Sequence, residues 1–420
     1  MKRRLWLAVP LMSMQTDLKM NHHPTVNEVF RNYGESYLQK HPEASLHERK
    51  VMRSIEICRT EALGGRVEEC SSCGHKVILY NSCRNRHCPQ CQSMKKEKWI
   101  LERKNEVLPF TYFHIVFTLP DTLNPVVIRN KRVVYDLMFD ICRRTLLSVS
   151  ADEKYFGADI GFFSILHTWG QKLNLHPHLH CVVPGGGYSE KKQKWIHASN
   201  NYFVPVQVLK MRFRSLFLQG LKELYRGEKL FLQGTPFISS KDFNSMIDSL
   251  FAAEWVVYLK ESFQGKESVI EYLARYTHRI AISNHRIVSF KDGIVRFKYK
   301  DYSDDNSEKI MELLAESFIQ RFMVHVVPRR FVRIRYFGLL SHRNKKRAIE
   351  ECRKFHDIIK EHIAIPQAWN EVYLHVTGKN ISCCPACKTG RLVVVEILEP
   401  VRFRSPPERL HCDDSIFTLN

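Results

Sequence analysis

The stretch Leu175-His-Pro-His-Leu-His-Cys-Val-Val-Pro184 decides how the rest of the chain is interpreted. Its apolar and β-branched residues, followed by Gly185-Gly-Gly187, predict a buried strand that ends at the glycines. Successive side chains of a strand alternate between its two faces, so His178 and His180 project from the same face. Two neutral imidazoles presented together can hold a divalent metal. The alternative is a pair of hydrogen-bonded core histidines, and the pattern favours the metal site.

A second stretch, residues 268–279, carries two tyrosines at helical spacing. Ser268 and Glu271 have the spacing of a capping box, which predicts a helix that begins there. Tyr272 and Tyr276 are four residues apart and therefore lie on one face of that helix. Such a pair is commonly an aromatic stripe in a core. Beside a histidine metal site, the two phenols become candidate nucleophiles that attack a phosphodiester and hold the DNA as a phosphotyrosine.

Taken together, these motifs resemble the rolling-circle HUH transposases of the two-tyrosine insertion-sequence type. The resemblance spans roughly residues 25–395 and extends to four further stretches: His167-Thr-Trp-Gly-Gln171, His176 to Gly187, Tyr272 to Asn284, and Arg333-Ile-Arg-Tyr-Phe-Gly-Leu-Leu340. It implies a transposase that nicks and rejoins single-stranded DNA at the ends of its mobile element, supporting rolling-circle transposition. It also implies an antiparallel sheet with the histidine pair on a central strand and the tyrosines on a nearby helix.

The balance of charge indicates a polyanionic partner. The 420 residues include 64 Lys and Arg against 44 Asp and Glu, a net charge of +20, which favours nucleic acid. The partners expected are single-stranded DNA at the element ends and target DNA.

The sequence contains no run of 18 or more apolar residues, so it predicts no membrane span. Lys2-Arg-Arg4 and the apolar residues after it imitate a signal peptide, but Pro10 interrupts them and no cleavage site follows. We therefore expect a cytoplasmic, nucleoid-associated bacterial protein.

The cysteines predict a zinc-binding module. Cys70-x-x-Cys73 and Cys88-x-x-Cys91 have the spacing of two zinc knuckles, and in a reducing compartment such pairs bind metal rather than form disulfides. Two knuckles can place four thiolates around one structural Zn²⁺ ion. Further candidate ligands, for an exchanged ligand or a second ion, are His75, Cys83, His87, and the downstream Cys384 and Cys387 with His411 and Cys412.

Hydrophobic patterning predicts the remaining elements and an α+β fold, with an antiparallel-sheet HUH nuclease core that has helices on one face and follows the small zinc-binding module. Expected strands are 111–119, 162–169, 175–183 and 255–259. Expected helices lie within 24–66 (divided at Pro42), 126–147, 205–253 and 307–322, and hairpins within 185–203 and 287–299. The expected divisions are an N-terminal extension (1–23), a helical and zinc-binding DNA-binding domain (24–108), the nuclease core (109–325), a basic DNA-contacting region (326–380) and a tail with a candidate zinc knuckle (381–420).

Cleavage of DNA at such a site needs a metal that polarises and orients the scissile phosphate, for which Mg²⁺ or Mn²⁺ is expected. The candidate third ligand is His167 on the preceding strand, because related HUH nucleases often take a ligand from that neighbourhood. Gln171 and His176 are the alternatives. The family motif favours Tyr272 as the first nucleophile and Tyr276 as its partner. The candidate DNA-binding residues are Arg84, Arg86, Arg275, Arg279, Arg333 and Arg335.

Two other classes of protein share part of this pattern. A plasmid replication initiator or relaxase of the HUH class has the same histidine and tyrosine site, although the chain has no Gly-x-x-x-x-Gly-Lys-Ser/Thr loop for a fused helicase. A non-catalytic, zinc-dependent DNA-binding regulator shares the charge and the cysteines. Such a regulator would need neither the histidine pair nor the tyrosine pair.

Overall fold

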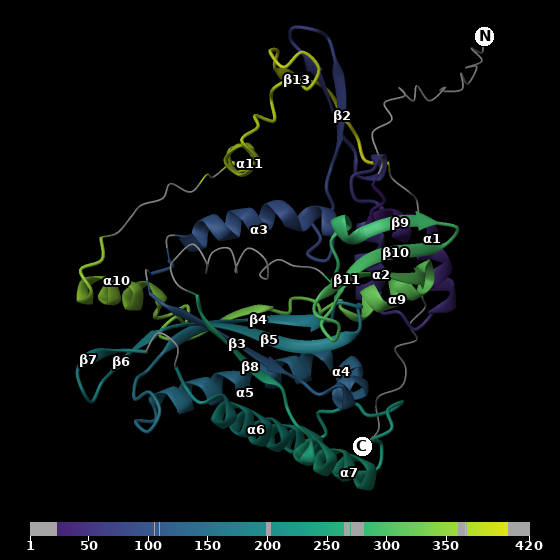
Figure 1. The fold of residues 1–420 in the computed structure, drawn as a ribbon. Coiled ribbons are helices and arrows are strands. Elements are labelled where there is room, and N and C mark those ends of the chain that lie inside the picture. Colours follow the sequence, from purple (N-terminus) through teal and green to yellow (C-terminus); the bar gives the residue numbers. More distant parts are fainter. Residues whose placement is uncertain are drawn as a thin grey trace, which may run out of the picture.

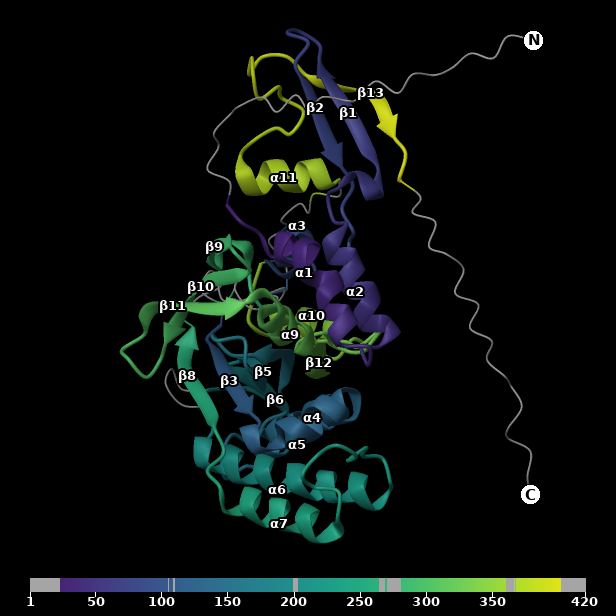
Figure 2. The same cartoon turned by 90° about the vertical axis from the view of Figure 1, so that its right-hand side faces the viewer.

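The computed structural model describes residues 23–104, 106–108, 110–198, 203–263, 269, 281–359, 366 and 368–401 (Figure 1). The expectations for Tyr272, Tyr276, Arg275, Arg279, His411 and Cys412 lie outside these residues. Figure 2 shows three tiers, with a small sheet at one end, helices α1, α2 and α9 in the middle, and a large sheet with its helices at the other end.

A five-stranded sheet in the order β12-β4-β5-β3-β8 forms the centre of the large tier. Its strands are β3 (Tyr112–Thr118), β4 (Gly161–Trp169), β5 (Leu175–Pro184), β8 (Val257–Phe263) and β12 (Ile334–Gly338). All four pairings are antiparallel. The α+β prediction is therefore confirmed, and the strand with the histidine pair is the middle strand of the sheet.

Helices cover one face of this sheet (Figure 1). They are α4 (Asn124–Arg129), α5 (Lys131–Ala151), α6 (Val206–Arg226) and α7 (Ser240–Ala252). Leu179, Cys181 and Val183 of β5 all project from this face, and they are fully buried in one cluster with Phe139 and Phe213 of the helices. Period-two alternation thus sends the even-numbered histidines to the opposite face.

The opposite face carries a smaller apolar cluster. Phe163, Ile165 and Val182 of the sheet are buried there together with Tyr112 and Val269. Helix α3 (Pro89–Lys104) lies on this side (Figure 1), and its Arg103 Nη1 donates a hydrogen bond of 2.8 Å to the Tyr336 hydroxyl. We call this side of the sheet the histidine face.

The N-terminal helices pack against a helix from the second half of the chain. Helices α1 (Val26–Lys40) and α2 (Leu46–Glu56) each begin at a capping box, Thr25 with Glu28 and Ser45 with Glu48. They share a core with α9 (Ala315–Val324), where Phe30 meets Phe322 edge to face at 5.2 Å. Residues that are far apart in sequence therefore form one hydrophobic unit.

The predicted helix over 307–322 is wrong in its first half. Residues Ser307–Leu314 form strand β11, which pairs with β10 (Ile294–Asp301), itself paired with β9 (Ile287–Lys291). The sequence Ser-Glu-Lys-Ile-Met-Glu-Leu-Leu alternates in exposure along this strand. Cross-strand ion pairs, Arg296–Glu312 at 2.5 Å and Lys298–Glu308 at 2.7 Å, stabilise the strand pairing.

The remaining elements are short. They are η1 (Glu61–Leu63), β1 (Gly65–Cys70), β2 (Lys76–Tyr80), η2 (Asp121–Leu123), β6 (Gly186–Ser189), β7 (Lys194–His197), η3 (Asn284–Arg286), α10 (Lys345–Phe355), α11 (Trp369–Thr377) and β13 (Leu392–Leu398). Strands β13, β1 and β2 form a small sheet of their own. In the part of the chain that the structure describes, no helix has the length and apolar character required to cross a membrane.

Candidate functional site

Three histidines meet on the histidine face of the sheet. His178 and His180 come from β5, and His167 comes from the neighbouring strand β4, where it is paired in register with His178. Their ring centroids are 4.7 Å apart for His178–His180, 4.5 Å for His167–His180 and 5.5 Å for His167–His178. One ring nitrogen of each lies within 4.8 Å of the others. Three imidazoles this close can share one metal ion.

Hydrogen bonding presents the Nε2 atom of His178 as a ligand. Its Nδ1–H donates to the His176 carbonyl at 2.6 Å, which places the proton on Nδ1 and leaves a lone pair on Nε2. Burial lowers the pKa of His178 to about 4. The ring is therefore neutral at pH 7, which is the state that binds a metal.

A fourth histidine, His114 of β3, supports the cluster. Its Nε2 lies 2.9 Å from Nδ1 of His180, and the two ring planes are inclined by only 8°. Sequence reasoning placed His114 on a strand but did not assign it to the site. The alternation of 111–119 was visible, but the pairing of this strand with β5 was not.

Neither alternative third ligand belongs to this cluster, although the His176 ring lies 5.3 Å from that of His178. His176 Nδ1 is 3.6 Å from Asp121 Oδ1, and Gln171 Nε2 donates to the Tyr302 hydroxyl at 2.9 Å. His167 instead stacks on Trp169, with centroids 4.6 Å apart and planes at 23°. Because Trp169 fixes the His167 ring beside the pair, the geometry favours His167 as the third ligand.

The residue Val269 links the predicted tyrosine helix to the same face. It is helical and fully buried, and it packs with Ile165 and Val182. These two residues lie two positions before His167 and two after His180 on their strands. Val269, which precedes Tyr272 by three residues, therefore contacts the sheet next to the histidine cluster.

Eight cysteines of the described residues form two separate clusters, so the prediction of one site from Cys70, Cys73, Cys88 and Cys91 is wrong. Strand β1 runs away from α2 for about 17 Å before Cys70 is reached, and β2 returns, so the two predicted knuckles lie at opposite ends of this hairpin. One cluster is Cys58, Cys83, Cys88 and Cys91, and the other is Cys70, Cys73, Cys384 and Cys387.

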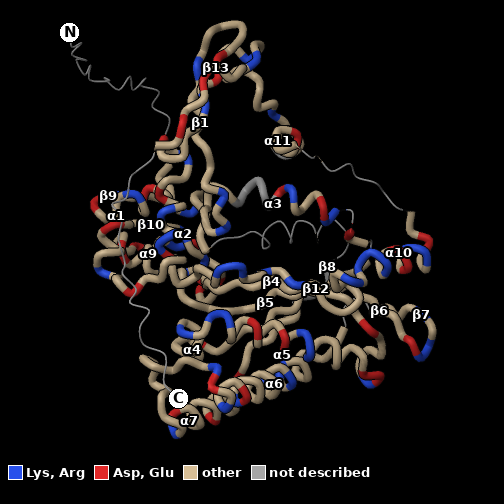
Figure 3. Tube along the Cα trace, turned by 180° about the vertical axis from the view of Figure 1, so that it is seen from behind, with Lys and Arg blue, Asp and Glu red and all other residues tan. Residues whose placement is uncertain are grey.

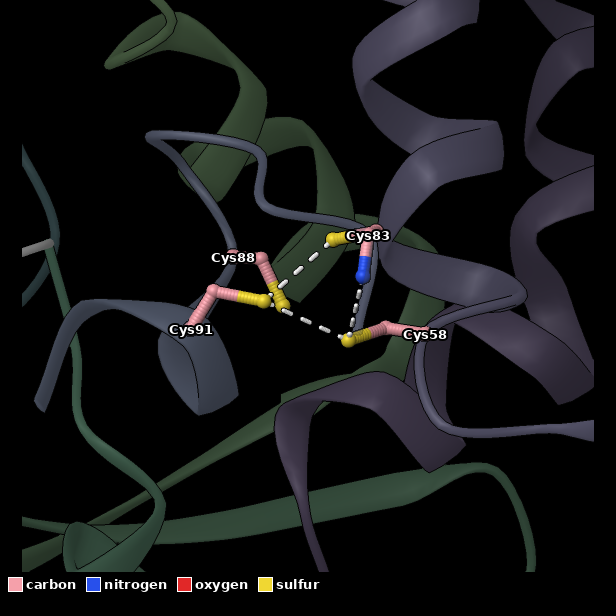
Figure 4. Close-up of side chains that lie close together, drawn as sticks. All are labelled: Cys58, Cys83, Cys88 and Cys91. Carbon is pink, nitrogen blue, oxygen red and sulfur yellow. Dashed lines mark hydrogen bonds between the residues drawn. The ribbon is translucent and has the colours of Figure 1, made fainter. Parts of the chain in front are cut away.

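The first cluster joins the end of α2 to the start of α3 (Figure 4). The Sγ atoms of Cys58 and Cys83 are 3.5 and 3.6 Å from that of Cys91. Four thiolates bound to zinc at ~2.3 Å have sulfurs about 3.8 Å apart, so the spacing fits a tetrahedral ion. Sequence reasoning missed Cys58 because it has no partner two or three residues away.

Polar neighbours of this cluster stabilise its thiolates. The Cys83 N–H donates to Cys58 Sγ at 3.5 Å, and Asn27 Nδ2 donates to Cys88 Sγ at 3.6 Å. The candidate ligand His87 is absent from this cluster, because its Nε2 accepts a hydrogen bond of 3.3 Å from the Val327 N–H.

The predicted DNA-binding arginines occupy different environments. Arg84 is exposed, whereas Arg86 Nη1 donates to the Phe331 carbonyl at 2.6 Å. Burial, with the nearby Arg86 guanidinium, lowers the pKa of Arg333 to about 10. Arg335 pairs with Asp136 and lies 4.2 Å above the Phe139 ring. Arg335 is thus held by α5, on the side of the sheet away from the histidines.

Comparisons with known proteins agree with this arrangement of parts. A family model described as a transposase zinc-binding domain matches residues 29–119, and one described as a putative transposase matches residues 161–348. The first range contains the whole Cys58 cluster, and the second contains His167, His178 and His180. No solved structure matches the chain.

Two curated proteins are similar over most of the chain. The putative transposase y4qJ of Sinorhizobium fredii is 44% identical over 383 residues, which are 90% of this chain and 96% of that protein. The transposase for insertion sequence element IS801 of Pseudomonas savastanoi pv. phaseolicola is 29% identical over 317 residues, 71% of this chain and 74% of that protein.

Proposed function

Because the chain belongs to the family of rolling-circle, two-tyrosine insertion-sequence transposases that carry an N-terminal zinc-binding domain, we propose how it cleaves DNA. It nicks and rejoins single-stranded DNA at the ends of its mobile element through a 5′-phosphotyrosine link, with a divalent metal held on the histidine face. The observation that carries this proposal is the cluster of His167, His178 and His180.

The donor set fits a divalent cation. Three neutral imidazoles contribute no charge of their own, so the ion keeps its full positive charge, and three protein ligands leave coordination positions for phosphate oxygens. A bound ion supplies Lewis-acid polarisation and orientation of the scissile phosphate. Of the two expected ions, Mn²⁺ suits an all-nitrogen set better than Mg²⁺, which prefers oxygen ligands.

The position of Val269 supports a tyrosine nucleophile. Residues three and seven positions apart lie on one side of a helix, and Tyr272 and Tyr276 follow Val269 by three and seven residues. In the helix that the capping box predicts, both phenols therefore share the side of Val269, which packs on the histidine face. Either tyrosine can then be directed at a phosphate bound beside the histidines.

The proposed step conserves the energy of the phosphodiester. The tyrosine Oη forms a bond to phosphorus while the bond from phosphorus to the 3′-oxygen breaks, the phenol gives up its proton, and the 3′-oxygen leaves as a hydroxyl. The reverse attack by a 3′-hydroxyl rejoins a strand without a nucleotide cofactor. Two tyrosines let one hold the donor strand while the other engages a second strand.

Basic elements near the histidine face supply phosphate contacts in this proposal. Figure 3 shows Lys and Arg on both α3 and α10. Helix α10 packs through Ile349 and Cys352 against Leu108, which lies in the chain between α3 and β3. Arg343 and Lys346, at its start, are exposed. Such side chains bind the backbone of single-stranded DNA without reading its sequence.

The free thiols of the described residues agree with a reducing compartment, which supports the cytoplasm as the place where this protein acts on nucleoid DNA.

A cleavage assay on single-stranded oligonucleotides from the element ends tests the function. We expect wild-type protein to form a denaturation-resistant adduct with the 5′ end of the cut strand. The double variant Tyr272→Phe, Tyr276→Phe should form none, because each change removes only the attacking oxygen. Tyr80→Phe is the matched control, since Tyr80 is an exposed residue of β2 in the separate small sheet. An adduct in the double variant would overturn the proposal, and cleavage at a plasmid origin instead of the element ends would favour a replication initiator.

A further inference from the structure

The second cysteine cluster joins the two ends of the chain. Cys70 and Cys73 lie at the tip of the β1–β2 hairpin, and Cys384 and Cys387 lie just before β13. The Sγ atoms are 3.6 Å apart for Cys70–Cys387 and 3.7 Å for Cys73–Cys384. These distances are close to the ~3.8 Å that a tetrahedral zinc with four thiolates requires.

The two Cys-x-x-Cys turns have the same backbone geometry. The residue after the second cysteine has a positive φ in both, 68° at Gly74 and 61° at Lys388. Its N–H donates to the carbonyl of the first cysteine in both, at 3.1 Å for Gly74 to Cys70 and 3.0 Å for Lys388 to Cys384. A non-glycine residue rarely adopts this conformation, so the second turn is held in the shape of the first.

Backbone N–H groups of both turns point at sulfur. The Ser72 N–H donates to Cys70 Sγ at 3.4 Å, and the Gly390 N–H donates to Cys387 Sγ at 3.3 Å. Such donors stabilise the thiolate form that binds metal. The turns also approach each other closely, because a Cβ atom at Gly390 would lie 2.3 Å from Cys70 Sγ. Glycine at this position thus permits the two turns to meet.

The sheet that carries these turns lacks a hydrophobic core of its own. Strand β13 pairs with β1 over Gly65↔Leu398 to Cys70↔Leu392, yet Ile78, Val393 and Val395 are exposed. None of the four hydrophobic clusters among the described residues includes a residue of β1, β2 or β13. A module this small, without a core, needs a metal or a disulfide to remain folded.

We propose that Cys70, Cys73, Cys384 and Cys387 bind a second structural zinc ion, separate from the ion of the Cys58 cluster, and that this ion fastens the C-terminal segment onto the N-terminal hairpin. The matched zinc-binding domain ends at residue 119, so it contains only half of these ligands. The hairpin can complete this site only with the far end of the chain. This site is a structural metal site that links two segments of the chain, and it contains no residue of the histidine cluster.

The metal content of the full-length protein tests whether this second zinc ion is present. Cys384→Ser should lower zinc by about one equivalent per chain relative to wild type, as measured by elemental analysis. Cys83→Ser should remove a different equivalent, and the double variant should lose about two. The matched control is Cys383→Ser, because Cys383 adjoins the cluster without belonging to it, and it should keep the wild-type content. Unchanged zinc content in Cys384→Ser would overturn the assignment. Wild-type protein that contains iron in place of the second zinc would overturn it as well.

A second measurement on unaltered protein does not depend on how the variants fold. Thiol alkylation read by mass spectrometry should label Cys383 first, because its half-buried thiol lies outside the cluster. Cys70, Cys73, Cys384 and Cys387 should stay protected and become reactive together when a chelator is added. Rapid labelling of Cys384 and Cys387 while Cys70 and Cys73 stay protected would show that the two ends share no ion.

Discussion

His114 Nε2 lies 2.9 Å from His180 Nδ1, and the two rings are almost parallel. If Nδ1 of His180 carries the proton, it donates to His114, and Nε2 of His180 presents its lone pair to the cluster with His167 and His178. His114 belongs to β3, whose Val116 pairs with His180, so it reaches His180 along the diagonal of the strand pair. A buried partner of this kind fixes both the tautomer and the orientation of a ligand.

We expect His114→Ala to weaken binding of Mn²⁺ at the histidine cluster by about 10- to 100-fold, the usual effect of losing such a partner. Calorimetric titration of the full-length protein measures this directly. His114→Gln should recover part of the affinity, because an amide can still accept the hydrogen bond. His285→Ala is the control, since His285 is exposed and distant in sequence. An unaltered affinity in His114→Ala would make His114 a packing residue only.

His178→Ala and His180→Ala should abolish nicking and leave DNA affinity within a few-fold of wild type. DNA affinity depends mainly on phosphate contacts and release of counterions, to which a neutral imidazole contributes little. Electrophoretic mobility shifts measure binding, and oligonucleotide cleavage measures nicking. Persistent cleavage by either variant in the presence of a chelator would show that the pair is structural.

Local patterns predicted the sheet and the histidine pair because both depend on neighbouring residues. Alternation along 175–184 fixes which side chains share a face, and the structure has Leu179 and His180 on opposite faces as this rule requires. The rule is a property of one strand, so no knowledge of the remaining fold is needed.

Pairings between distant segments were not predictable. The strand at Ser307–Leu314 was interpreted as a helix because Ile310, Leu313 and Leu314 also fit helical spacing, and only pairing with β10 decides between the two periods. Cys70 and Cys384 are likewise separated by 314 positions, and their proximity follows from the pairing of β1 with β13. Spacing within a Cys-x-x-Cys motif identifies a ligand pair but leaves its partner pair open.

Arg335 and Arg343 should respond differently to loss of charge. Arg335 pairs with Asp136 and lies over Phe139 and Phe331, so Arg335→Gln should lower the free energy of unfolding by about 1 kcal/mol with DNA affinity nearly unchanged. Arg343 is exposed, so Arg343→Gln should leave the free energy of unfolding unchanged. It should make the slope of log K for DNA binding against log salt concentration shallower by the amount expected for about one phosphate contact. Urea unfolding and binding at several salt concentrations measure the two effects. A large loss of DNA affinity in Arg335→Gln alone would restore its predicted role in DNA binding.

His325, at the end of α9, should make the fold sensitive to acid. It is buried, with Nδ1 3.2 Å from Thr168 Oγ1 and Nε2 3.3 Å from the Leu173 carbonyl. Burial, with the nearby Lys131 charge, lowers its pKa to about 3, whereas a histidine in an unfolded chain titrates near ~6.5. Between these values the unfolded chain binds a proton that the folded protein does not, so stability falls as the pH falls through this window.

The expected size of this effect is about 2 kcal/mol of unfolding free energy lost between pH 7.5 and pH 5. His325→Gln removes the titrating group and keeps an amide that can bond to Thr168 or Leu173. The advantage of wild type over this variant in urea unfolding should therefore shrink by that amount over the same pH range. Both proteins keep the same cysteine clusters, so acid release of zinc affects them alike and cancels in the comparison. An advantage that stays constant with pH would mean that the pKa of His325 is the same in the folded and the unfolded chain.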